Sequence, residues 1–529
     1  MSNLTLADVL NERADMKETE NGMLAYSVKT LDDMVRWFYL VNDNLTKAND
    51  HRKFTHENSP YIIVHTQVSN EIVDAYEKAI ETKDEETLHR LNRFMAFLRD
   101  PRHGLGQRHL FRAVASRVMQ TTANLDAVVN HGRWDDLIAI EHHNRNGFVS
   151  DEICSKVLKQ LAEDFANEKE NKPVSLLGKW MPSANTSSKE TKKVAKKWAK
   201  ILEVNEAKYR KILSSLRKRI DITEHYLDPS DMSGLDYSKV PSNAMNRYMN
   251  QFRHHDHDRF CEYMEKVANG EEKVNTDTNT VVDVYAKVMH DVVNNKEENT
   301  LLKEMFKQMT GEGDPNVEYL PVIDVSGSMN APITSTITSR IVAHAIGIML
   351  AKRNKGIFKD LAIAFSDDAK VIRFETDDIY QNCHEILQHQ DYGSTDIGSV
   401  FEMLASYVES NNLPKDSIPT LVVITDCEFN QCSYGRYGFY NPCGDNRMAS
   451  YRKFLEDKGI KSPRVIFWNT QARSGTIPVK DDGENQITYV SGFSTNILDA
   501  IANGDCDTKA WLLEKLKEAT WDDADHLLI

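Results

Sequence analysis

The chain has 529 residues, of which 40% are hydrophobic and 27% are charged, and it carries a net charge of −15. A single hydrophobic core stops growing at roughly 250–300 residues, so this length predicts two large domains. The composition is that of a globular protein and excludes the disordered and fibrous classes. Seven cysteines, scattered over a long chain, do not suggest a disulfide framework and indicate a reducing compartment.

Neither a membrane span nor a secretion signal is expected. The most apolar stretch, residues 341–351, has about half of the ~20 residues that a membrane-spanning helix needs. The first residues, MSNLTLAD, lack the basic and apolar regions of a signal peptide. We therefore expect a cytoplasmic protein.

Residues 1–312 are expected to fold as one helix after another. Apolar residues recur there at helical spacing, and strand-like alternation is nearly absent. Helices are predicted at residues 69–81, 88–98, from after Gly106 to Val118, and at 153–166, 189–202, 206–219, 244–252 and 259–267. Many helices joined by short turns favour an all-α helical-repeat domain, although the sequence shows no fixed period.

A turn-rich segment at residues 311–315 marks a change, and strands alternate with helices over residues 313–529. Near-continuous apolar strands alternating with helices predict an α/β domain with a doubly wound, mostly parallel sheet. Strands are predicted at 318–323, 360–365, 370–374, 420–425, 464–468 and 486–490, and helices at 341–353, 379–388, 396–409, 448–458 and 496–502. The close pair at 360–374 predicts a hairpin with one antiparallel edge strand.

Charge is distributed unevenly along the chain. Residues 313–529 contain 20 Lys and Arg against 31 Asp and Glu, whereas residues 171–220 contain 14 basic against 3 acidic residues. Residues 87–117 add seven arginines against one aspartate. Two concentrated basic segments in an acidic protein favour an anionic partner held at one place, and a solvated helical face is the alternative.

The strand expected before residue 324 runs directly into Asp324-Val-Ser326-Gly-Ser328. Mg²⁺ prefers about six oxygen ligands, and two hydroxyls on a tight loop can face one centre. Open α/β sheets place ligand sites beyond the carboxyl ends of their strands, so this loop is a candidate site for a divalent cation.

This Asp-x-Ser-x-Ser pattern, followed in order by Thr395 and Asp426 on other expected loops, resembles the metal-ion-dependent adhesion site of von Willebrand factor A domains. The resemblance implies that Asp324, Ser326, Ser328, Thr395 and Asp426 converge on one Mg²⁺ or another divalent cation. The resemblance implies that residues 313–529 form such a domain, in which a carboxylate from a protein partner or a water completes the coordination of the metal. It thus implies a docking site more than a catalytic one. A domain that keeps these loops without binding metal is the alternative.

Several short motifs of the helical half occur together and in order. They are FLRDPRHGLGQR at 97–108, GRWDDL at 132–137, KWMPS at 179–183, VPSNAMNRY at 240–248 and FRHHD at 252–256. Followed by a von Willebrand A-type domain, they resemble a Ro-like family of bacteria, plants and viruses that is related to the TROVE module. The resemblance covers roughly residues 60–510 and implies a ring or arch of paired, HEAT-like helices that binds non-coding RNA.

The basic segments supply the phosphate contacts that such a role requires. The candidate RNA-binding residues are Arg99, Arg102, Arg108, Lys192, Lys193, Lys196 and Lys197. Trp134 or Trp180 is a candidate for stacking on a base, with packing between helices as the favoured alternative. The overall acidic charge departs from what tight, generic RNA binding would need.

Other arrangements that suggest chemistry are set aside. His384 and His389 are five residues apart and therefore point in different directions around a helix. The run 254–258 (HHDHD) is expected to start a helix, and Cys427, Cys432 and Cys443 lack paired zinc-ligand spacing. No nucleophile triad or phosphate-binding loop is present, so we predict that the protein is not an enzyme.

An aromatic insertion follows Asp426 within a few residues. Its candidate partner-binding residues are Tyr434, Arg436, Tyr437, Phe439 and Tyr440. Such a segment makes a poor core and a plausible contact loop at the metal-bearing edge. The alternative is that the loop folds back onto the helical domain.

Taken together, the sequence favours a Ro-like protein that binds non-coding or single-stranded RNA and docks a protein partner through Mg²⁺. The main alternative is a metal-dependent protein–protein scaffold or viral structural component without RNA binding. A chelatase-like regulator that works with a motor ATPase is a third hypothesis.

Overall fold

The computed structural model describes residues 16–18, 24–27, 33–45, 60–144, 146–220, 222–276, 279–311, 318–333, 336–390, 393, 395–427, 447–470, 476–477, 487–491 and 508–529. The chain divides into two compact units. The α/β unit comprises Met1–Val64 and Met264–Leu513, and the helical unit comprises His65–Tyr263 and Glu514–Ile529.

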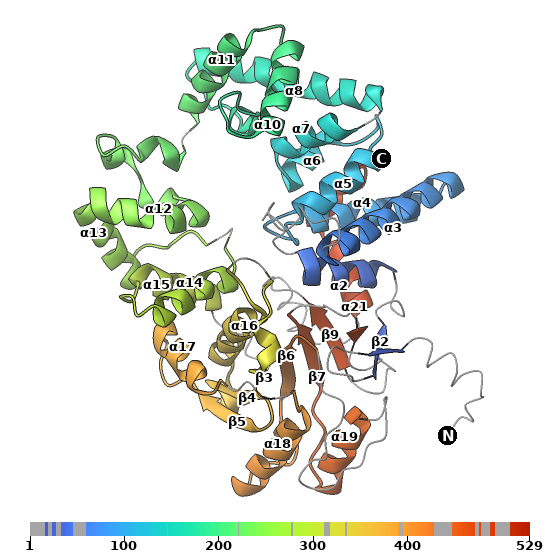
Figure 1. Cartoon of the computed structure of the whole chain (residues 1–529), viewed down its shortest axis with the longest axis vertical. Helices are drawn as coiled ribbons and strands as arrows, with labels where there is room; N and C mark the ends of the chain where they lie inside the picture. Colours follow the sequence, from blue (N-terminus) through green and yellow to red (C-terminus); the bar gives the residue numbers. More distant parts are fainter. Residues whose placement is uncertain are drawn as a thin grey trace. The chain divides into compact units, whose positions relative to one another are not determined.

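The helical unit is built from helices in the described residues, as predicted (Figure 1). Short 3-10 segments at Thr223–Tyr226, Met232–Gly234 and Tyr237–Lys239 connect the last ones. Its α-helices are α3 (Pro60–Thr82), α4 (Glu85–Arg99), α5 (Arg108–Val118), α6 (Leu125–His131), α7 (Trp134–His143), α8 (Gly147–Lys169), α9 (Leu177–Trp180), α10 (Lys189–Ile201), α11 (Glu206–Arg219), α12 (Ser242–His255) and α13 (His257–Ala268).

The turn between α4 and α5 illustrates how the sequence builds this unit. Helix α4 ends at Arg99, directly before Asp100 and Pro101, where the sequence predicts a break. A Cβ atom on Gly104 would lie 1.8 Å from the carbonyl oxygen of Phe97, so only glycine fits this turn. The close turn lets the buried faces of α4 and α5 pack together.

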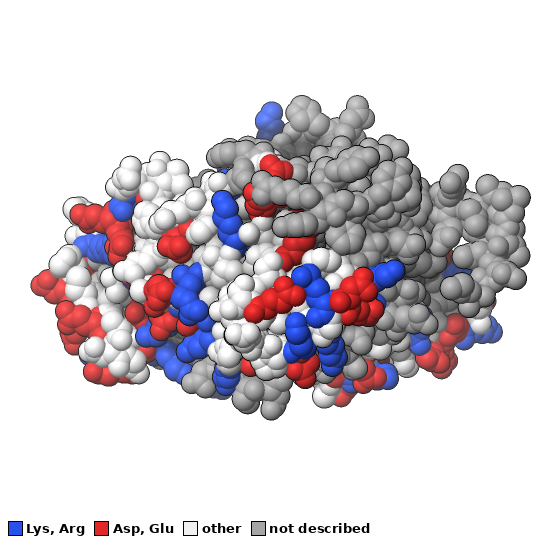
Figure 2. All heavy atoms as spheres, turned by 90° about the horizontal axis from the view of Figure 1, so that it is seen from below, with Lys and Arg blue, Asp and Glu red and all other residues white. Residues whose placement is uncertain are grey.

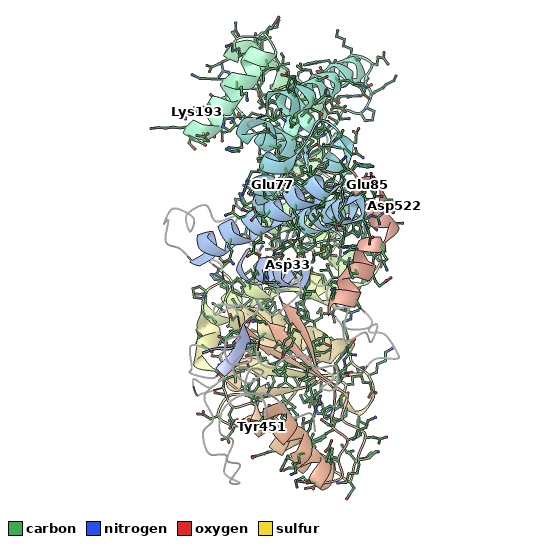
Figure 3. All side chains as sticks on the ribbon, turned by 90° about the vertical axis from the view of Figure 1, so that its right-hand side faces the viewer. Asp33, Glu77, Glu85, Lys193, Tyr451 and Asp522 are labelled. Atoms are coloured by element: carbon green, nitrogen blue, oxygen red, sulfur yellow. The ribbon has the colours of Figure 1, made fainter. Side chains whose placement is uncertain are left out.

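The last residues of the chain belong to the helical unit, which the sequence did not indicate. After α21 (Thr508–Lys517), the 3-10 segment η7 (Ala519–Ala524) packs along α4, and Figure 3 shows Asp522 beside Glu85 at the start of that helix. Trp521 is fully buried, with its ring 5.8 Å from that of Phe97. Arg93 of α4 forms ion pairs with Asp522 and Asp525.

The α/β unit contains a six-stranded sheet in the order β5-β4-β3-β6-β7-β9 (Figure 1). All neighbours are parallel except β4 and β5, which form the predicted hairpin with an antiparallel edge strand. The strands are β3 (Tyr319–Asp324), β4 (Leu361–Phe365), β5 (Ala369–Arg373), β6 (Thr420–Thr425), β7 (Val465–Asn469) and β9 (Ile487–Ser491). A helical unit and an α/β unit are therefore confirmed as the two fold classes.

Helix α16 (Ser339–Arg353) is buried from Ser339 to Ala351, because it lies between the sheet and further helices. A Cβ atom on Gly347 would lie 2.3 Å from Cδ1 of Ile323, so glycine is needed where α16 crosses β3. Helices α14 (Val281–Val293), α15 (Thr300–Thr310) and α17 (Ile379–Gln388) pack on its other side, and α18 (Gly398–Ser410) and α19 (Arg447–Asp457) complete the unit. The apolar run at 341–351 is thus a core helix.

Two features differ from the expectation for residues 1–312. Strands β1 (Met16–Glu18) and β2 (Leu24–Ser27) form a small antiparallel sheet with β8 (Thr476–Ile477), and α2 (Asp33–Leu45) follows them in the α/β unit. Helices α14 and α15 belong to the α/β unit, so the compact units divide the chain at other points than 312/313.

The helix expected at 496–502 lies outside the described residues. Within the described part, no helix is both long and apolar enough to cross a membrane.

Candidate functional site

The carboxyl ends of β3 and β6 lie side by side at one edge of the sheet, where Asp324 ends β3 and Asp426 follows β6. The sheet changes direction here, because the chain continues from β3 to β4 on one side and later returns to β6 on the other. Such a switch point is where open α/β sheets bind ligands.

Asp324 is fully buried and is held by hydrogen bonds from both neighbouring segments. The backbone N–H of Ser326 donates to its Oδ1 at 2.9 Å, and the hydroxyl of Thr425 donates to its Oδ2 at 2.6 Å. The hydroxyl oxygens of Ser326 and Ser328 lie 3.1 Å apart. The loop therefore gathers one carboxylate and two hydroxyls at the strand end.

The two carboxylates repel each other in a buried setting. Burial raises the pKa of the Asp324 carboxyl above its usual range, and the charge of Asp426 raises it further, although hydrogen bonds from Ser326 and Thr425 oppose both effects. Asp426 is also buried, with 1% of its surface exposed. Two buried carboxylates that repel each other are stabilised by a bound cation.

The backbone at the end of β6 takes an unusual conformation that fixes this geometry. Cys427 has a φ of 58°, in the left-handed region that residues other than glycine rarely adopt. Its N–H donates to the hydroxyl of Thr425 at 3.1 Å, and its side chain is buried. The chain thus turns sharply directly after Asp426, and strained backbone of this kind is common at functional sites.

Thr395 approaches the same edge from the loop before α18. The N–H of the next residue, Asp396, donates to the carbonyl oxygen of Ser366, which directly follows β4. A Cβ atom on Gly393 would lie 2.9 Å from the Ser366 hydroxyl, so the loop lies close against the end of β4. The Thr395 hydroxyl is buried and has no hydrogen-bond partner among the described residues. A buried hydroxyl without a partner is costly, and a ligand to it would remove the cost.

The residues at this edge fit a hard divalent cation. They supply carboxylate and hydroxyl oxygens, which suit Mg²⁺ better than zinc. Within the described residues, no group of three or more His, Cys, Asp or Glu side chains is arranged to hold a metal. The predicted site has two carboxylates and three hydroxyls, so it is not a group of that kind. Metal binding by Asp324, Ser326, Ser328, Thr395 and Asp426 stays a prediction.

Thr425 is a site residue that the sequence analysis missed. Its hydroxyl connects Asp324 on β3 to the turn at Cys427, so it orients a predicted ligand without being one. The signal available in the sequence was its place directly before Asp426 at the end of an apolar strand. A strand-end threonine whose side chain points to the neighbouring strand is not recognisable without the sheet order.

The predicted RNA contacts in the first basic segment differ in exposure. Arg99 is 3% exposed, and its guanidinium pairs with the fully buried Asp136 at 2.7 Å. It therefore stabilises the helical unit and is not available to a phosphate, which corrects the expectation for this residue. Arg102 is exposed and Arg108 is half-buried.

In the second basic segment, the lysines form a stripe along α10, hereafter the lysine stripe. Its members share one face through i, i+3 and i+4 spacing and are Lys189, Lys192, Lys193, Lys196, Lys197 and Lys200. All six are exposed, and Figure 3 shows Lys193 pointing away from the helix. Ala195, Trp198 and Ala199 are buried on the opposite face.

Local acidic residues neutralise part of the lysine stripe. Lys193 lies 3.8 Å from Glu190 and Lys196 lies 3.4 Å from Glu206, both at the surface. Lys197 pairs with the buried Glu141. In the described part of the chain, Lys192 and Lys200 have no ion-pair partner. Unlike the lysine stripe, the face of the α/β unit that carries α18 and α19 shows acidic and basic side chains interspersed with one another (Figure 2).

Neither candidate tryptophan is an open stacking surface. Trp134 is buried, with 7% exposure, which agrees with the packing alternative. Trp180 is half-buried, and the guanidinium carbon of Arg133 lies 4.1 Å from the centre of its ring. One face of Trp180 is therefore already covered by a cation.

The remaining sequence features have structural roles or lie outside the description. His255 ends α12, and Asp256 accepts hydrogen bonds from Tyr237 and Arg259. His389 lies 3.4 Å from Glu385 of the same helical turn. The predicted partner-binding residues Tyr434, Arg436, Tyr437, Phe439 and Tyr440 lie outside the described residues, as do Cys432 and Cys443.

Two family models match adjacent parts of the chain, and both are described as domains of unknown function. DUF2828 matches residues 152–313 and DUF7788 matches residues 318–524. An uncharacterized protein of Acanthamoeba polyphaga mimivirus, L728, is 25% identical over 448 residues, which cover 77% of this chain and 75% of the viral protein.

Among solved structures, the Ro (RSR) protein of Deinococcus radiodurans matches 89% of this chain and 99% of its own. The sequence identity is 12% and the TM-score is 0.33. The family models and the viral relative carry no assigned activity.

Proposed function

We propose that this protein is a Ro-like RNA-binding protein with a metal-dependent docking site for a protein partner. The helical unit binds non-coding or single-stranded RNA, and its helices form a HEAT-like ring or arch. The α/β unit is of the von Willebrand A type and binds Mg²⁺ or another divalent cation. Both roles are binding roles, and no catalytic step is assigned to either unit.

The lysine stripe is the observation that carries the RNA proposal. From Lys189 to Lys200 it extends about 16 Å at 1.5 Å per residue, and it presents ammonium groups to solvent along its whole length. The following helix, α11, adds six basic residues against one glutamate. Such a surface attracts a polyanion without reading its sequence. Because Lys192 and Lys200 have no carboxylate partner in the described chain, they would contribute most.

A salt titration tests this role. Changing Lys192, Lys193, Lys196 and Lys200 to Gln should weaken the binding of a single-stranded RNA and reduce the slope of log K against log salt by about 0.7 for each lost phosphate contact. Lys197 is left intact because its removal would leave Glu141 buried without a partner.

A matched control removes the same charge elsewhere. Lys355, Lys359, Lys370 and Lys415 are exposed on the α/β unit, and their change to Gln should leave the RNA affinity and its salt dependence unchanged. Equal effects of both quadruple variants would show that only net charge matters. Absence of RNA binding at low salt, together with no ribonuclease-sensitive excess absorbance at 260 nm in the purified protein, favours the metal-dependent scaffold or viral structural component.

The buried hydroxyl of Thr395, which has no hydrogen-bond partner in the described residues, supports the metal proposal. Asp324 and Asp426 provide negative charge, while Ser326, Ser328 and Thr395 provide neutral oxygens, as a Mg²⁺ site requires. When bound, the cation would offer a coordination position to a carboxylate of a protein partner. Mg²⁺ should raise the melting temperature of the folded protein, because it binds the native state only. Asp324→Ala should abolish the rise without unfolding the chain, and an unchanged rise would contradict the site.

The aromatic loop after Asp426 is proposed to form one wall of the docking site. Tyrosine and phenylalanine offer large contact area at low entropic cost. Capture of a partner from the native host, with and without EDTA, identifies the metal-dependent fraction. Tyr437→Ala with Phe439→Ala should reduce capture while leaving the Mg²⁺-induced rise and the melting temperature unchanged. A fall in melting temperature of several degrees would instead show that these aromatics pack inside the fold.

A further inference from the structure

The side chain of Arg133, directly before α7, is held between an aromatic ring and a carboxylate. Its guanidinium carbon lies 4.1 Å from the centre of the Trp180 ring. Its Nε lies 3.2 Å from Oδ1 of Asp135, and its Nη2 donates to Oδ2 of the same carboxylate at 3.5 Å. A guanidinium donates hydrogen bonds in its plane and meets aromatic rings with its face, so these two contacts together fix the plane of the group.

Arg133 keeps one planar face for a ligand. Its side chain is 31% exposed, and within the described residues its guanidinium makes no ion pair or ring contact besides those with Asp135 and Trp180. Because Trp180 covers one face, the opposite face is the flat surface that remains. A side chain that is already fixed in this way loses little freedom when a ligand lies on it.

The neighbouring arginines are engaged inside the helical unit. Arg99 is 3% exposed and pairs with Asp136 at 2.7 Å. Arg112 pairs with Asp135 at 2.8 Å and with Asp136 at 2.6 Å. Burial lowers the pKa of Arg112, but the two aspartates outweigh it and raise the pKa overall. These two arginines stabilise the fold, and Arg133 differs from them by the exposure and geometry of its plane, not by an excess of positive charge.

A partly exposed face of α7 connects Arg133 with the lysine stripe. The residues that share this face through i, i+3 and i+4 spacing are Asp135, Ala139, His142 and His143. Nε2 of His142 lies 3.2 Å from Glu190, which in turn pairs with Lys193 of the stripe at 3.8 Å. From residue 133 to residue 142 the helix rises about 14 Å at 1.5 Å per residue. A strand bound along α10 can therefore continue over α7 to Arg133.

We infer that the guanidinium face of Arg133, backed by Trp180, stacks on one unpaired base of the RNA strand that the lysine stripe binds. Arginine planes and aromatic rings are the surfaces on which proteins stack the splayed-out bases of single-stranded RNA. Every base has a π-face, so such a contact adds affinity without selecting a sequence. This inference rests on the proposed RNA binding and commits it to an unpaired segment of the RNA.

The test separates the contribution of the bases from that of the phosphates. It compares a short single-stranded oligoribonucleotide with an abasic strand of the same length, which retains the ribose phosphates and lacks the bases. Binding is measured by fluorescence anisotropy with a label at one end. The wild-type protein should bind the strand with bases about tenfold more tightly, which corresponds to about 1.4 kcal/mol and lies in the range of one stacked base.

Variants locate the stacking surface. Arg133→Lys keeps the charge and removes the plane, so it should bring the affinity ratio between the two strands close to one while the salt dependence of binding stays unchanged. Trp180→Leu removes the ring behind the guanidinium and should also lower the ratio. Arg210→Lys is the matched control, because Arg210 is exposed on α11 and no aromatic ring of the described residues lies over it. It should leave the ratio unchanged.

The outcomes separate this inference from the function on which it rests. A ratio of one in the wild-type protein, with salt-dependent binding preserved, overturns the stacking site and leaves RNA binding by the lysine stripe intact. A tenfold ratio that persists in Arg133→Lys also overturns it, as does an equal fall of the ratio in Arg210→Lys. Melting curves establish that each variant is folded, and Trp180→Leu takes the place of Arg133→Lys if the latter is not. If neither strand binds at low salt, the inference and the proposed RNA binding both fail.

Discussion

Two valine substitutions at the metal-bearing edge are expected to have opposite effects on stability and on metal binding. Thr395 and Thr425 are both buried threonines, and valine has nearly the same shape. The Thr425 hydroxyl makes two hydrogen bonds, to Asp324 at 2.6 Å and from the N–H of Cys427 at 3.1 Å. Within the part of the chain that the structure describes, the Thr395 hydroxyl makes none. The difference between the variants therefore isolates what each hydroxyl does.

Without metal, Thr425→Val should cost about 2–4 kcal/mol, because one lost bond is to a charged group and the other leaves a buried N–H. At about 2.1 cal/mol/K of unfolding entropy per residue, a unit of about 310 residues shifts its melting temperature by about 1.5 °C per kcal/mol, so the melting temperature should fall by roughly 3–6 °C. Thr395→Val should not destabilise the metal-free protein, because it removes a buried hydroxyl whose lack of a hydrogen bond costs about 1–3 kcal/mol.

With Mg²⁺ at 100 times its dissociation constant, the free energy of unfolding of the wild-type protein should rise by about 2.7 kcal/mol. Thr395→Val should lose most of this gain. Differential scanning calorimetry in EDTA and in a Mg²⁺ series measures both quantities. The reasoning is refuted if Thr395→Val keeps the full Mg²⁺ shift, or if it destabilises the EDTA-treated protein as much as Thr425→Val does.

Three further predictions concern the helical unit. Asp136→Asn should destabilise it by about 3–5 kcal/mol in urea titrations, because it leaves Arg99 buried without a counter-charge; a loss below about 1 kcal/mol would show that the ion pair is not needed. Burial lowers the pKa of His131, but hydrogen bonds from its ring to Asp100 and Asp523 raise it above 6.5 overall. The stabilisation that protonated His131 gives to the fold is therefore complete below pH 6.5 and is lost as the pH rises through the folded-state pKa. The stability deficit of His131→Gln should thus shrink between pH 6 and 9, and a constant deficit would contradict this. Trp521→Ala should cost about 3–5 kcal/mol, because the ring is fully buried in the described helical unit, and an unchanged melting curve would show that the C-terminal segment does not stabilise it.

Much of the α/β unit was predictable because its signals are local. Buried parallel strands are apolar along their whole length, as at β3 and β6, and each is followed by polar residues at its carboxyl end. The order of strands and helices then implies which loops share an edge of the sheet. Asp324 and Asp426 could be named as neighbours because their motifs resemble a von Willebrand A-type metal site, whereas Thr425 could not, since its role depends on where its side chain points.

The helical unit shows what local patterns leave open. Arg99 and Arg102 are three residues apart in one arginine-rich segment, yet one is buried against Asp136 and the other is exposed. A charged residue has the same appearance in the sequence in both settings. Only the packing of α4 against α5 and α7 decides which arginine needs a carboxylate partner inside the fold.

Local sequence patterns were enough to predict the helices of the helical unit, the change to alternating strands and helices, and the residues at the carboxyl ends of β3 and β6, but not the strands β1 and β2. Only the folded chain shows that β2 pairs with β8, and that the segment after Leu513 packs on α4. These pairings join residues more than 400 positions apart. Periodicity arises from neighbours within a few residues along the chain, whereas a long-range pairing depends on complementary surfaces that exist only once both partners are folded.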